Sequence, residues 1–447
     1  MSLFDDYEDA VEPPPKEGTP EKLLCERHCS TPYNGEPWRV LITGGAGHLA
    51  DHLVEKLVTG GNDAEEDWRT TNQAFASYNI DRGIEENLPA YIQIVLVDLV
   101  EPDPRMLKLY YITFVKGSFD DIEVMPTALE GVDTVYHLAA VGMTGQYARD
   151  RKACMNINSV GTMNLLSWAR NAGVKRFIYS SSIGVVFDGK SLINANERLP
   201  YPDVYYNFYC ESKAHAERIV QKASTDEMKT TVLRFNGIYG PGEKRVTERV
   251  VHFIASGWWI ALCKPNGIEA KTQLSSVDNC VQGLLKAELT LRHSDSPQGQ
   301  IYNIMDKQPV GTFSFWSQLA REFGFADPSI TIPSGAMRGF AVLCQYLADK
   351  FKVDPFVSLL EIDLLLINNT FSIAKAEREL GYRPQDPPIH QIADYYRSRG
   401  ICKKSPLRQY ITMTHVLGMF IGLAIFYIVS NSFLWTYSIF ESLFMLI

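Results

Sequence analysis

The 447-residue chain has little positive charge and little cysteine. Lysine and arginine total 43 against 52 acidic residues, a formal net charge of −9, so no nucleic-acid partner is expected, because phosphate binding needs clustered basic residues. The eight cysteines are scattered, which excludes a dense disulfide framework and favours reduced thiols facing a cytosolic compartment. The one local cluster, Cys25, His28 and Cys29, has no second pair at zinc-ligand spacing, so no metal site is expected.

The N-terminal end of the chain lacks a long apolar run, and the C-terminal end lacks charged residues. Residues 1–37 hold acidic residues and three consecutive prolines but no apolar core of the kind that a secretion signal has. We expect a disordered extension there. The 32 residues Gln409–Phe440, in contrast, contain no Asp, Glu, Lys or Arg, and about 20 apolar residues are enough to cross a bilayer core. The sequence predicts one transmembrane helix near 412–434 and a short tail at 435–447.

The residues that flank this run indicate its orientation. Lys403, Lys404 and Arg408 precede it, and Trp435 and Tyr437 stand near its far end. Basic flanks stay on the cytoplasmic side and aromatic residues gather at the membrane interface. We therefore expect a single-pass C-terminal anchor that leaves the larger N-terminal part in the cytoplasm. A buried soluble helix is disfavoured by the length of the run, and a hairpin return stays open.

Short apolar runs alternate with helical patterns between the two ends. Strands are expected at 38–42, 92–97, 112–115, 134–138 and 177–179. Continuous apolar strands separated by helices are typical of a parallel sheet that is covered on both faces. The fold class is therefore α/β, a doubly wound parallel sheet of the Rossmann type.

The same pattern divides the chain into units. We expect a larger α/β core over 38–235 and a smaller, mixed lobe over 236–405. A polar stretch at 60–90 interrupts the first βα unit, which normally needs no such connection. We interpret it as a surface insertion.

The sequence TGGAGHLA at Thr43–Ala50 follows an apolar strand and opens a helical pattern. In this setting glycines indicate dinucleotide binding. Gly44 permits the sharp turn, Gly47 lets the backbone approach a pyrophosphate, and Ala50 is small enough for close packing of helix on sheet. The helix N-terminus supplies unpaired N–H groups to the anion. A plain turn is the weaker alternative.

Asp98 ends the second apolar strand, in IVLVDLVEP, where a carboxylate binds the ribose diol of a dinucleotide. It stands about fifty residues after the glycines rather than about 20, and the insertion accounts for the difference. A carboxylate there repels a 2′-phosphate, so NAD is favoured over NADP. The alternative is a solvent-exposed aspartate at a strand end.

Tyr209 and Lys213 stand four residues apart in YCESK, so they share one helix face. A free tyrosine has a pKa of about 10 and is a poor base at neutral pH. A neighbouring ammonium stabilises the phenolate. The serine run that ends at Ser182 closes the strand upstream, where parallel sheets present functional groups.

Seven stretches carry a resemblance that covers residues 38 to about 400: TGGAGHLA, VDTVYHLAAVGM, NINSVGTMNLL, RFIYSSSIGVVF, YCESKAHAE, LRFNGIYGPGE and FSIAKAERELGY. The chain resembles an extended short-chain dehydrogenase/reductase of the 3β-hydroxysteroid dehydrogenase/isomerase family, in its 42E-like branch. Sterol-4α-carboxylate 3-dehydrogenase is similar too. The resemblance implies the endoplasmic reticulum as location and leaves a coupled isomerisation open.

The resemblance also implies roles for the two units, a dinucleotide-binding and catalytic core over 38–235 and a substrate-binding lobe over 236–405, and roles for single residues. Tyr209 would be the general base and acid, Lys213 would hold the nicotinamide ribose and lower the Tyr209 pKa, and Ser182 would hydrogen-bond the reacting oxygen. The residues expected to hold or line NAD are Gly44, Gly47, Ala50, Asp98, Ala139, Ala140 and Lys213. Three positions depart from the family pattern and put single contacts in doubt: Ser118, Phe235 and Ser276.

Other features have competing interpretations. We expect His137 to be a satisfied core or near-cofactor imidazole rather than a catalytic group, and His215 and Glu217 to be solvated. The apolar stretch Gly339–Ile367 is interpreted first as helices that pack the smaller lobe and second as a membrane-facing lid.

The favoured function is NAD-dependent oxidation of a 3β-hydroxyl on a steroid, sterol or related lipid, because a membrane anchor brings an enzyme to substrates that partition into bilayers. A nucleotide-sugar epimerase or dehydratase has the same fold and the same Ser, Tyr and Lys set, and an NAD-binding scaffold without turnover is a third possibility. A homodimer stays open as well.

Overall fold

The structure is a computed structural model that describes residues 38–59, 92–108, 111–142, 150–351 and 357–401. Several predictions from the sequence lie outside these residues: the extension 1–37 with its cysteine cluster, the insertion 60–90, the transmembrane helix 412–434 and the tail 435–447. Among the residues that are described, no helix combines the length and the apolar character needed to cross a bilayer.

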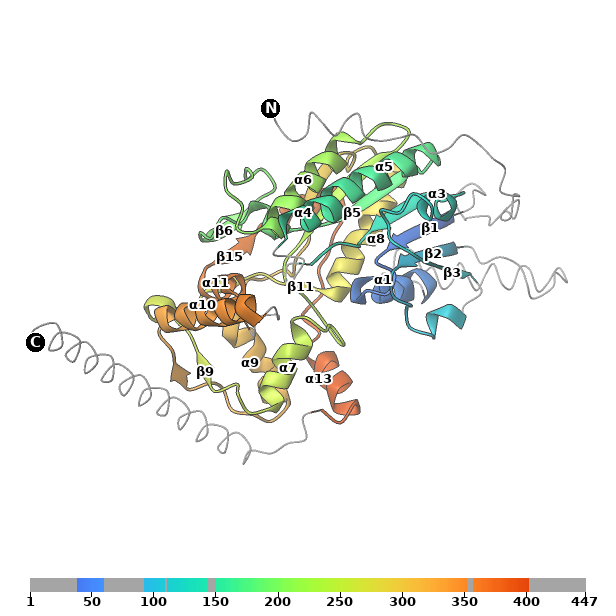
Figure 1. The fold of residues 1–447 in the computed structure, drawn as a ribbon. Coiled ribbons are helices and arrows are strands. Elements are labelled where there is room, and N and C mark those ends of the chain that lie inside the picture. The colour runs from blue at the N-terminus through green and yellow to red at the C-terminus, as the bar shows by residue number, and fades with distance from the viewer. Residues whose placement is uncertain (1–37, 60–91, 109–110, 143–149, 352–356, 402–447) are drawn as a thin grey trace, which may run out of the picture.

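A seven-stranded sheet forms the centre of the larger half (Figure 1). Its strands, in spatial order, are β12 (Gln300–Asn303), β7 (Lys229–Phe235), β5 (Arg176–Ser182), β4 (Thr134–His137), β1 (Trp38–Thr43), β2 (Ile92–Asp98) and β3 (Ile112–Lys116). Every neighbouring pair is parallel, which confirms the predicted fold class. The chain order reverses between β1 and β4, and the carboxyl ends of strands at such a reversal are where ligands bind.

Helices cover both faces of the sheet (Figure 1). The first face packs against α1 (His48–Thr59) and α8 (Val277–His293), the second against α3 (Met125–Ala128), α5 (Thr162–Asn171) and α6 (Phe208–Lys222). The strands are apolar on both sides for this reason. In β1, Val40 and Ile42 join the first core cluster, whereas Leu41 between them joins the second.

Two elements that complete the larger half, one strand and one helix, come from beyond residue 236. β12 pairs with β7 along its whole length, and α8 covers the sheet beside α1. The larger half of the molecule is therefore completed by segments that are interleaved with the smaller lobe along the chain.

The smaller lobe lies over the carboxyl ends of the strands, and α7, α9 and α13 meet in its own core around Tyr239, Phe315 and Ile392. Its elements are β8 (Ile238–Tyr239), α7 (Thr247–Ala255), β9 (Ala261–Leu262), β10 (Lys271–Thr272), β11 (Ser275–Ser276), β13 (Val310–Gly311), α9 (Thr312–Glu322), β14 (Ile330–Thr331), α10 (Ser334–Phe351), α11 (Leu359–Leu366), β15 (Asn369–Phe371) and α13 (Ile389–Ser398). The helix α12 (Ala374–Glu379) instead packs into the first core cluster of the larger half, beside β12. β6 (Leu192–Ala195) extends from the larger half and pairs with β15.

Candidate active site

The glycine turn between β1 and α1 is shaped by close backbone contacts. Gly44 has a φ of +74°, and a Cβ added to it would lie 3.0 Å from the backbone nitrogen of Ala139. A Cβ on Gly45 would lie 2.7 Å from the Cβ of Leu96. Only glycine combines left-handed backbone with this lack of space, so the turn can pass tightly between three strand ends.

Gly47 and Ala50 complete the turn. Gly47 donates a hydrogen bond to the carbonyl of Gly44 (2.9 Å) and is exposed at the start of α1, so a ligand can approach its backbone. Ala50 is buried in the core beneath α1. The N–H groups of the first turn of an α-helix have no intrahelical partner, which gives this end of α1 the donors that a pyrophosphate requires. The residues present therefore fit a dinucleotide.

Asp98 lies beside this turn at the carboxyl end of β2. Its Oδ2 accepts a hydrogen bond from the N–H of Ala46 (3.0 Å), and its Oδ1 accepts one from Val100 (3.2 Å). The side chain is half-buried. The carboxylate therefore stands next to the glycines despite the long separation in sequence, and it also holds the turn in place.

Ala139 and Ala140 follow β4 and are half-buried beside the same turn. Asn158 anchors the segment that continues from them, because its amide oxygen accepts a hydrogen bond from Val141 N–H (2.8 Å). The amide nitrogen of Asn158 donates to Ser212 Oγ (3.0 Å) on α6. Asn158 lies in a π-helical segment, Met155–Gly161, a rare conformation that is frequent at functional sites. It links the wall of the cofactor site to the helix of Tyr209, a role that sequence reasoning missed.

His137 is a satisfied core histidine. Its Nδ1 is 2.7 Å from Thr43 Oγ1 and its Nε2 is 2.8 Å from Thr162 Oγ1. Burial, and then the charge of Lys213, hold the pKa of His137 well below its usual value. The neutral ring ties β1, β4 and α5 together, in agreement with the favoured interpretation of its sequence position.

The first turn of α6 carries Tyr209. Asn207 caps this helix by accepting a hydrogen bond from Cys210 N–H (2.9 Å). The hydroxyl of Ser182, at the end of β5, lies close enough to the Tyr209 phenol to lower its pKa. Burial raises the pKa of Tyr209 to about 12, while the Ser182 hydroxyl and the charge of Arg245 act in the opposite direction. The structure thus brings the two predicted hydroxyl groups together.

Lys213 lies one turn along the same face of α6. Its Nζ donates to the carbonyl of Ser180 (2.6 Å) and stands 4.2 Å above the ring of Tyr179. Burial lowers the pKa of Lys213 to about 7, and the negative charge of Glu217 opposes that shift. The ammonium therefore depends on nearby acceptors to keep its proton.

Glu217 supplies part of that support, and the prediction that it is solvated is wrong. It is fully buried because β7 places Arg234 opposite it, with Arg234 Nε 3.1 Å from Oε1. The same carboxylate accepts hydrogen bonds from Ser181 Oγ (2.5 Å) and Tyr201 OH (2.7 Å). His215, for which the same prediction was made, is only half-buried, and burial lowers its pKa.

The Glu217 contacts bear directly on the reacting groups. Ser181 lies between Ser180, which accepts the Lys213 hydrogen bond, and Ser182, which contacts Tyr209. Glu217 therefore fixes the end of β5 that carries both partners. The sequence feature that could have indicated a buried partner for Glu217 is Arg234, the one charged residue in the run TTVLRF.

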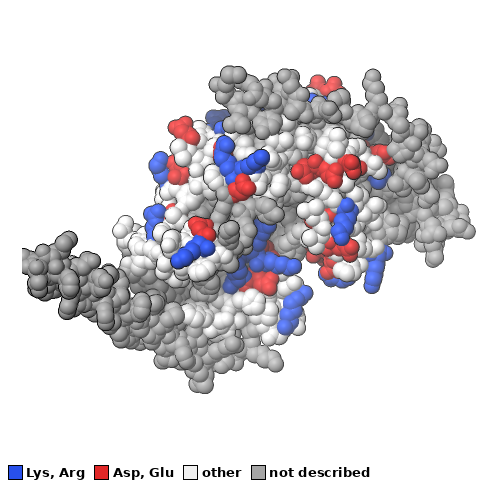
Figure 2. Space-filling model, viewed as in Figure 1, with Lys and Arg blue, Asp and Glu red and all other residues white. Residues whose placement is uncertain are grey.

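Arg245 contributes a second cation from the smaller lobe. Its guanidinium packs against Gly142, where a Cβ would lie 2.6 Å from Nη1. The carboxylate of Glu243 accepts hydrogen bonds from the backbone N–H groups of Arg245, Val246 and Thr247. Figure 2 shows Lys and Arg side chains gathered near the start of α7, where the two halves of the molecule meet. Sequence reasoning had not singled out Arg245.

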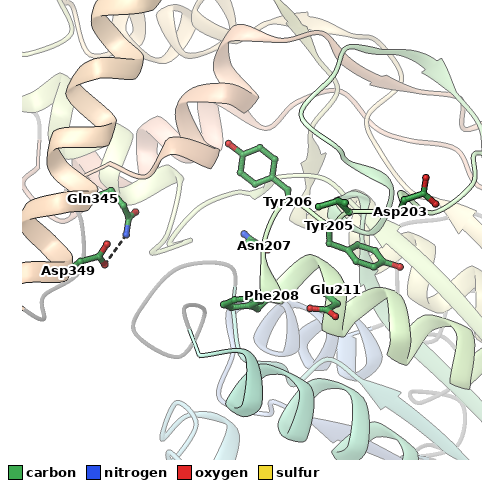
Figure 3. Close-up of a pocket in the computed structure, with 9 residues that line it drawn as sticks. Asp203, Tyr205, Tyr206, Asn207, Phe208, Glu211, Gln345 and Asp349 are labelled. Atoms are coloured by element: carbon green, nitrogen blue, oxygen red, sulfur yellow. Dashed lines mark hydrogen bonds between the residues drawn. The ribbon is translucent and has the colours of Figure 1, made fainter. Parts of the chain in front are cut away.

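A cavity of about 650 Å³ opens beside the N-terminus of α6 (Figure 3). The segment 203–208 and Glu211 form one side, and Gln345 and Asp349 of α10 form the other. Tyr209 directly follows the lining residue Phe208. The cavity therefore lies at the start of the helix that carries Tyr209 and is bounded in part by α10.

The three positions that depart from the family pattern have local roles. The Ser118 hydroxyl donates to Asp120. Phe235 is buried in the core at the end of β7. Ser276 caps α8 by accepting from Asn279 N–H (3.3 Å). None of these contacts involves Tyr209, Lys213 or Ser182.

The sequence pattern of the 3-beta hydroxysteroid dehydrogenase/isomerase family matches residues 41–334. The chain belongs to this family. It is 64% identical over 368 residues to 3beta-hydroxysteroid dehydrogenase/Delta(5)-Delta(4) isomerase 1 of Caenorhabditis elegans, covering 81% of this chain and 79% of that protein. It is 30% identical over 328 residues to short-chain dehydrogenase/reductase family 42E member 1 of Xenopus laevis, covering 70% and 84% of the two chains.

Solved structures of more distant proteins share the fold of this family member. The dTDP-glucose 4,6-dehydratase DesIV of Streptomyces venezuelae, with NAD bound, superposes with a TM-score of 0.58 at 20% identity, covering 81% of this chain and 98% of its own. The UDP-glucuronic acid 4-epimerase of Bacillus cereus, in complex with NAD, gives 0.57 at 17% identity, covering 80% and 99%. These likenesses confirm the Rossmann architecture.

Proposed function

We propose that the protein oxidises a 3β-hydroxyl on a steroid, a sterol or a related lipid, with NAD as acceptor. The observation that carries the proposal is that the end of β5 lies against α6 in a member of this family: Ser182 lies beside the Tyr209 phenol, and the Ser180 carbonyl accepts a hydrogen bond from Lys213 (2.6 Å). The activities for which the relatives are named, 3β-hydroxysteroid dehydrogenase and isomerase, support the substrate class.

The protein's own groups account for the proton transfer. The hydroxyls of Ser182 and Tyr209 would hold the oxygen of the substrate, and Tyr209 would accept its proton as the alcohol becomes a carbonyl. Burial stabilises the neutral phenol, and the positive charge of Arg245 opposes that effect. The ammonium of Lys213, one turn along the helix, would favour the phenolate further. NAD, when bound, supplies the acceptor for the hydride.

The proposal extends to a location. The charge-free run Gln409–Phe440 would anchor the protein in a membrane, with basic residues before it on the cytoplasmic side. A lipid substrate dissolved in that membrane would reach the site at high local concentration. The endoplasmic reticulum is the membrane that the family resemblance favours.

The test of the function is a substrate panel for the purified full-length protein. We expect NADH to form with 3β-hydroxysteroids and not with their 3α epimers, because the two hydroxyls fix the face on which the carbinol carbon is presented. Formation of a conjugated enone from Δ5 substrates would show a coupled isomerisation. Turnover of UDP-sugars in place of steroids would contradict the proposal and favour an epimerase or dehydratase.

The proposed preference for NAD over NADP can be tested at Asp98. Replacing Asp98 with asparagine is expected to reduce the preference for NAD over NADP by about tenfold or more, because a hydrogen bond to a charged group contributes about 1.5–3 kcal/mol and the repulsion of a 2′-phosphate is lost. Dissociation constants of both dinucleotides measured by calorimetry provide the check. Asp103→Asn, a change at an exposed aspartate paired with Arg105 (2.8 Å), is the control. An unchanged preference in Asp98→Asn would exclude the assigned role.

A further inference from the structure

Arg245 is a cation beside the active site that has no anionic partner among the residues that the structure describes. The arginines near it in the smaller lobe are paired: Arg249 lies 2.5 Å from Glu361, and Arg338 lies 3.2 Å from Asp363. A guanidinium carries five N–H donors and no acceptor. The donors of Arg245 are therefore available for an anionic ligand.

The guanidinium of Arg245 occupies the space that a side chain at position 142 would fill. A Cβ built on Gly142 would lie 2.6 Å from Nη1, 3.0 Å from Cζ and 3.1 Å from Nη2 of Arg245. The missing side chain of Gly142 thus makes room for a cation that comes from the smaller lobe. Arg245 as a whole is exposed, so a ligand can reach the other side of the guanidinium.

The loop that carries Arg245 is held by its own hydrogen bonds. The buried carboxylate of Glu243 accepts from the backbone N–H groups of Arg245 (2.7 Å), Val246 (2.7 Å) and Thr247 (2.9 Å). The N–H of Gly240 donates to Thr247 Oγ1 (3.2 Å). Glu243 therefore fixes the backbone of the loop and leaves the charge of the Arg245 side chain unpaired.

The two segments that hold this guanidinium both border the glycine turn. Gly142 follows Ala139 by three residues, which span at most about 11 Å, and the backbone nitrogen of Ala139 would lie 3.0 Å from a Cβ on Gly44. On the other side, a Cβ on Gly240 would lie 3.6 Å from Nε2 of His48, the first residue of α1. The free cation thus comes from a loop that contacts the helix end to which a dinucleotide presents its diphosphate.

The charges at the glycine turn do not balance those of a diphosphate. A helix N-terminus contributes only about half an elementary positive charge, and the Asp98 carboxylate beside the turn adds a negative one. His48 does not compensate, because burial lowers its pKa to about 3 and keeps its ring neutral. Lys213 is directed to the carbonyl of Ser180. Arg245 can supply the missing positive charge.

We propose that the guanidinium of Arg245 binds the diphosphate of NAD, so that the glycine turn holds the dinucleotide from one side and the smaller lobe holds it from the other. A planar guanidinium is suited to bind two phosphate oxygens at once. Because Arg245 stands just before α7 of the smaller lobe, bound NAD would tie this lobe to the larger half. The proposal rests on the dinucleotide in the proposed function and not on the steroid.

Nucleotide binding by the purified full-length protein tests the contact. Arg245→Gln is compared with Lys244→Gln, which removes the same charge from the neighbouring exposed residue. Calorimetry should show a dissociation constant for NAD that is about tenfold or more higher in Arg245→Gln, because hydrogen bonds to charged groups are strong, and nearly unchanged in Lys244→Gln. ADP, in competition with NADH, should show the same loss, whereas adenosine, which has no phosphate, should compete equally well in all three proteins.

Three results would overturn the proposal. The first is an unchanged dissociation constant for NAD in Arg245→Gln. The second is an equal loss with ADP and adenosine, which would indicate a damaged site rather than a lost phosphate contact. The third is unchanged binding of NAD together with a higher KM for a steroid that carries a carboxylate, which would assign Arg245 to the substrate.

Hydrogen exchange tests the tie between the two halves. NAD is expected to slow amide exchange of the segment 240–250 several-fold in the wild type and not in Arg245→Gln, whereas exchange at the start of α1 should slow in both when NAD is saturating. No slowing at 240–250 in the wild type would contradict the proposal. If the wild type bound no dinucleotide, the proposed function would fail together with this contact. If it bound NAD as tightly as Arg245→Gln does, only the role of Arg245 would fail.

Discussion

Tyr209→Phe is expected to lower kcat for NADH formation by about 10²–10⁴, the usual contribution of a positioned general acid or base. Phenylalanine keeps the ring in its half-buried position and removes only the hydroxyl that lies beside Ser182. Apart from Lys213, which the change leaves in place, the residues assigned to NAD lie near the ends of β1, β2 and β4, so the dissociation constant of NAD is expected to change little. Steady-state kinetics and calorimetric titration measure the two quantities.

A matched control is the phenol of Tyr205, which lies in the segment just before α6. Tyr205→Phe also removes one hydroxyl, and we expect it to keep most of the kcat. Unfolding temperatures of both variants show whether either change harms the fold. If Tyr209→Phe and wild type formed NADH at the same rate, Tyr209 would not be the base. If neither formed NADH while both bound NAD, a nucleotide-binding scaffold would be favoured.

Local pattern was enough to predict the parts of the fold that are local. The β1 turn and α1 follow from an apolar run, a glycine cluster and apolar residues at helical spacing within one short segment. The pairing of β12 with the central sheet and the packing of α8 on that sheet could not be predicted this way. Gln300–Asn303 is a four-residue strand, and its pairing with β7 depends on contacts about seventy residues away in sequence, which no local periodicity encodes.

The candidate site shows the same limit. Tyr209 and Lys213 are singled out by helical spacing together with the serine run and the glycine turn upstream, and Asp98 by its position at a strand end. Glu217 has the same spacing again, one turn beyond Lys213, but its burial depends on where β7 places Arg234. A carboxylate on a helix is solvated by default, since burying an unpaired charge is costly. Whether Glu217 is buried or solvated therefore depends on Arg234 of β7, and the order of residues along the chain does not show that these two side chains meet.

The role of Glu217 leads to a second prediction, whose expected free-energy effect is comparable to that of Tyr209→Phe. Glu217→Gln is expected to destabilise the fold by about 3–5 kcal/mol, because it leaves Arg234 as an unpaired buried charge. It is also expected to lower the pKa of Lys213 further below about 7, since the negative charge that opposes the effect of burial is lost. Lys213 is an ammonium only below its pKa. The alkaline limb of the kcat/KM profile should therefore move to lower pH.

Glu288 provides the control for this change. It is also buried and paired with arginines, Arg176 (3.0 Å) and Arg292 (2.6 Å), but it lies on α8, on the face of the sheet opposite to α6. Glu288→Gln should cost similar stability in a denaturant titration without moving the pH profile. If both variants kept the wild-type profile, Glu217 would be a structural residue alone. A shift confined to Glu217→Gln would show that the charge of the buried carboxylate acts on Lys213, and so on the phenol that Lys213 supports.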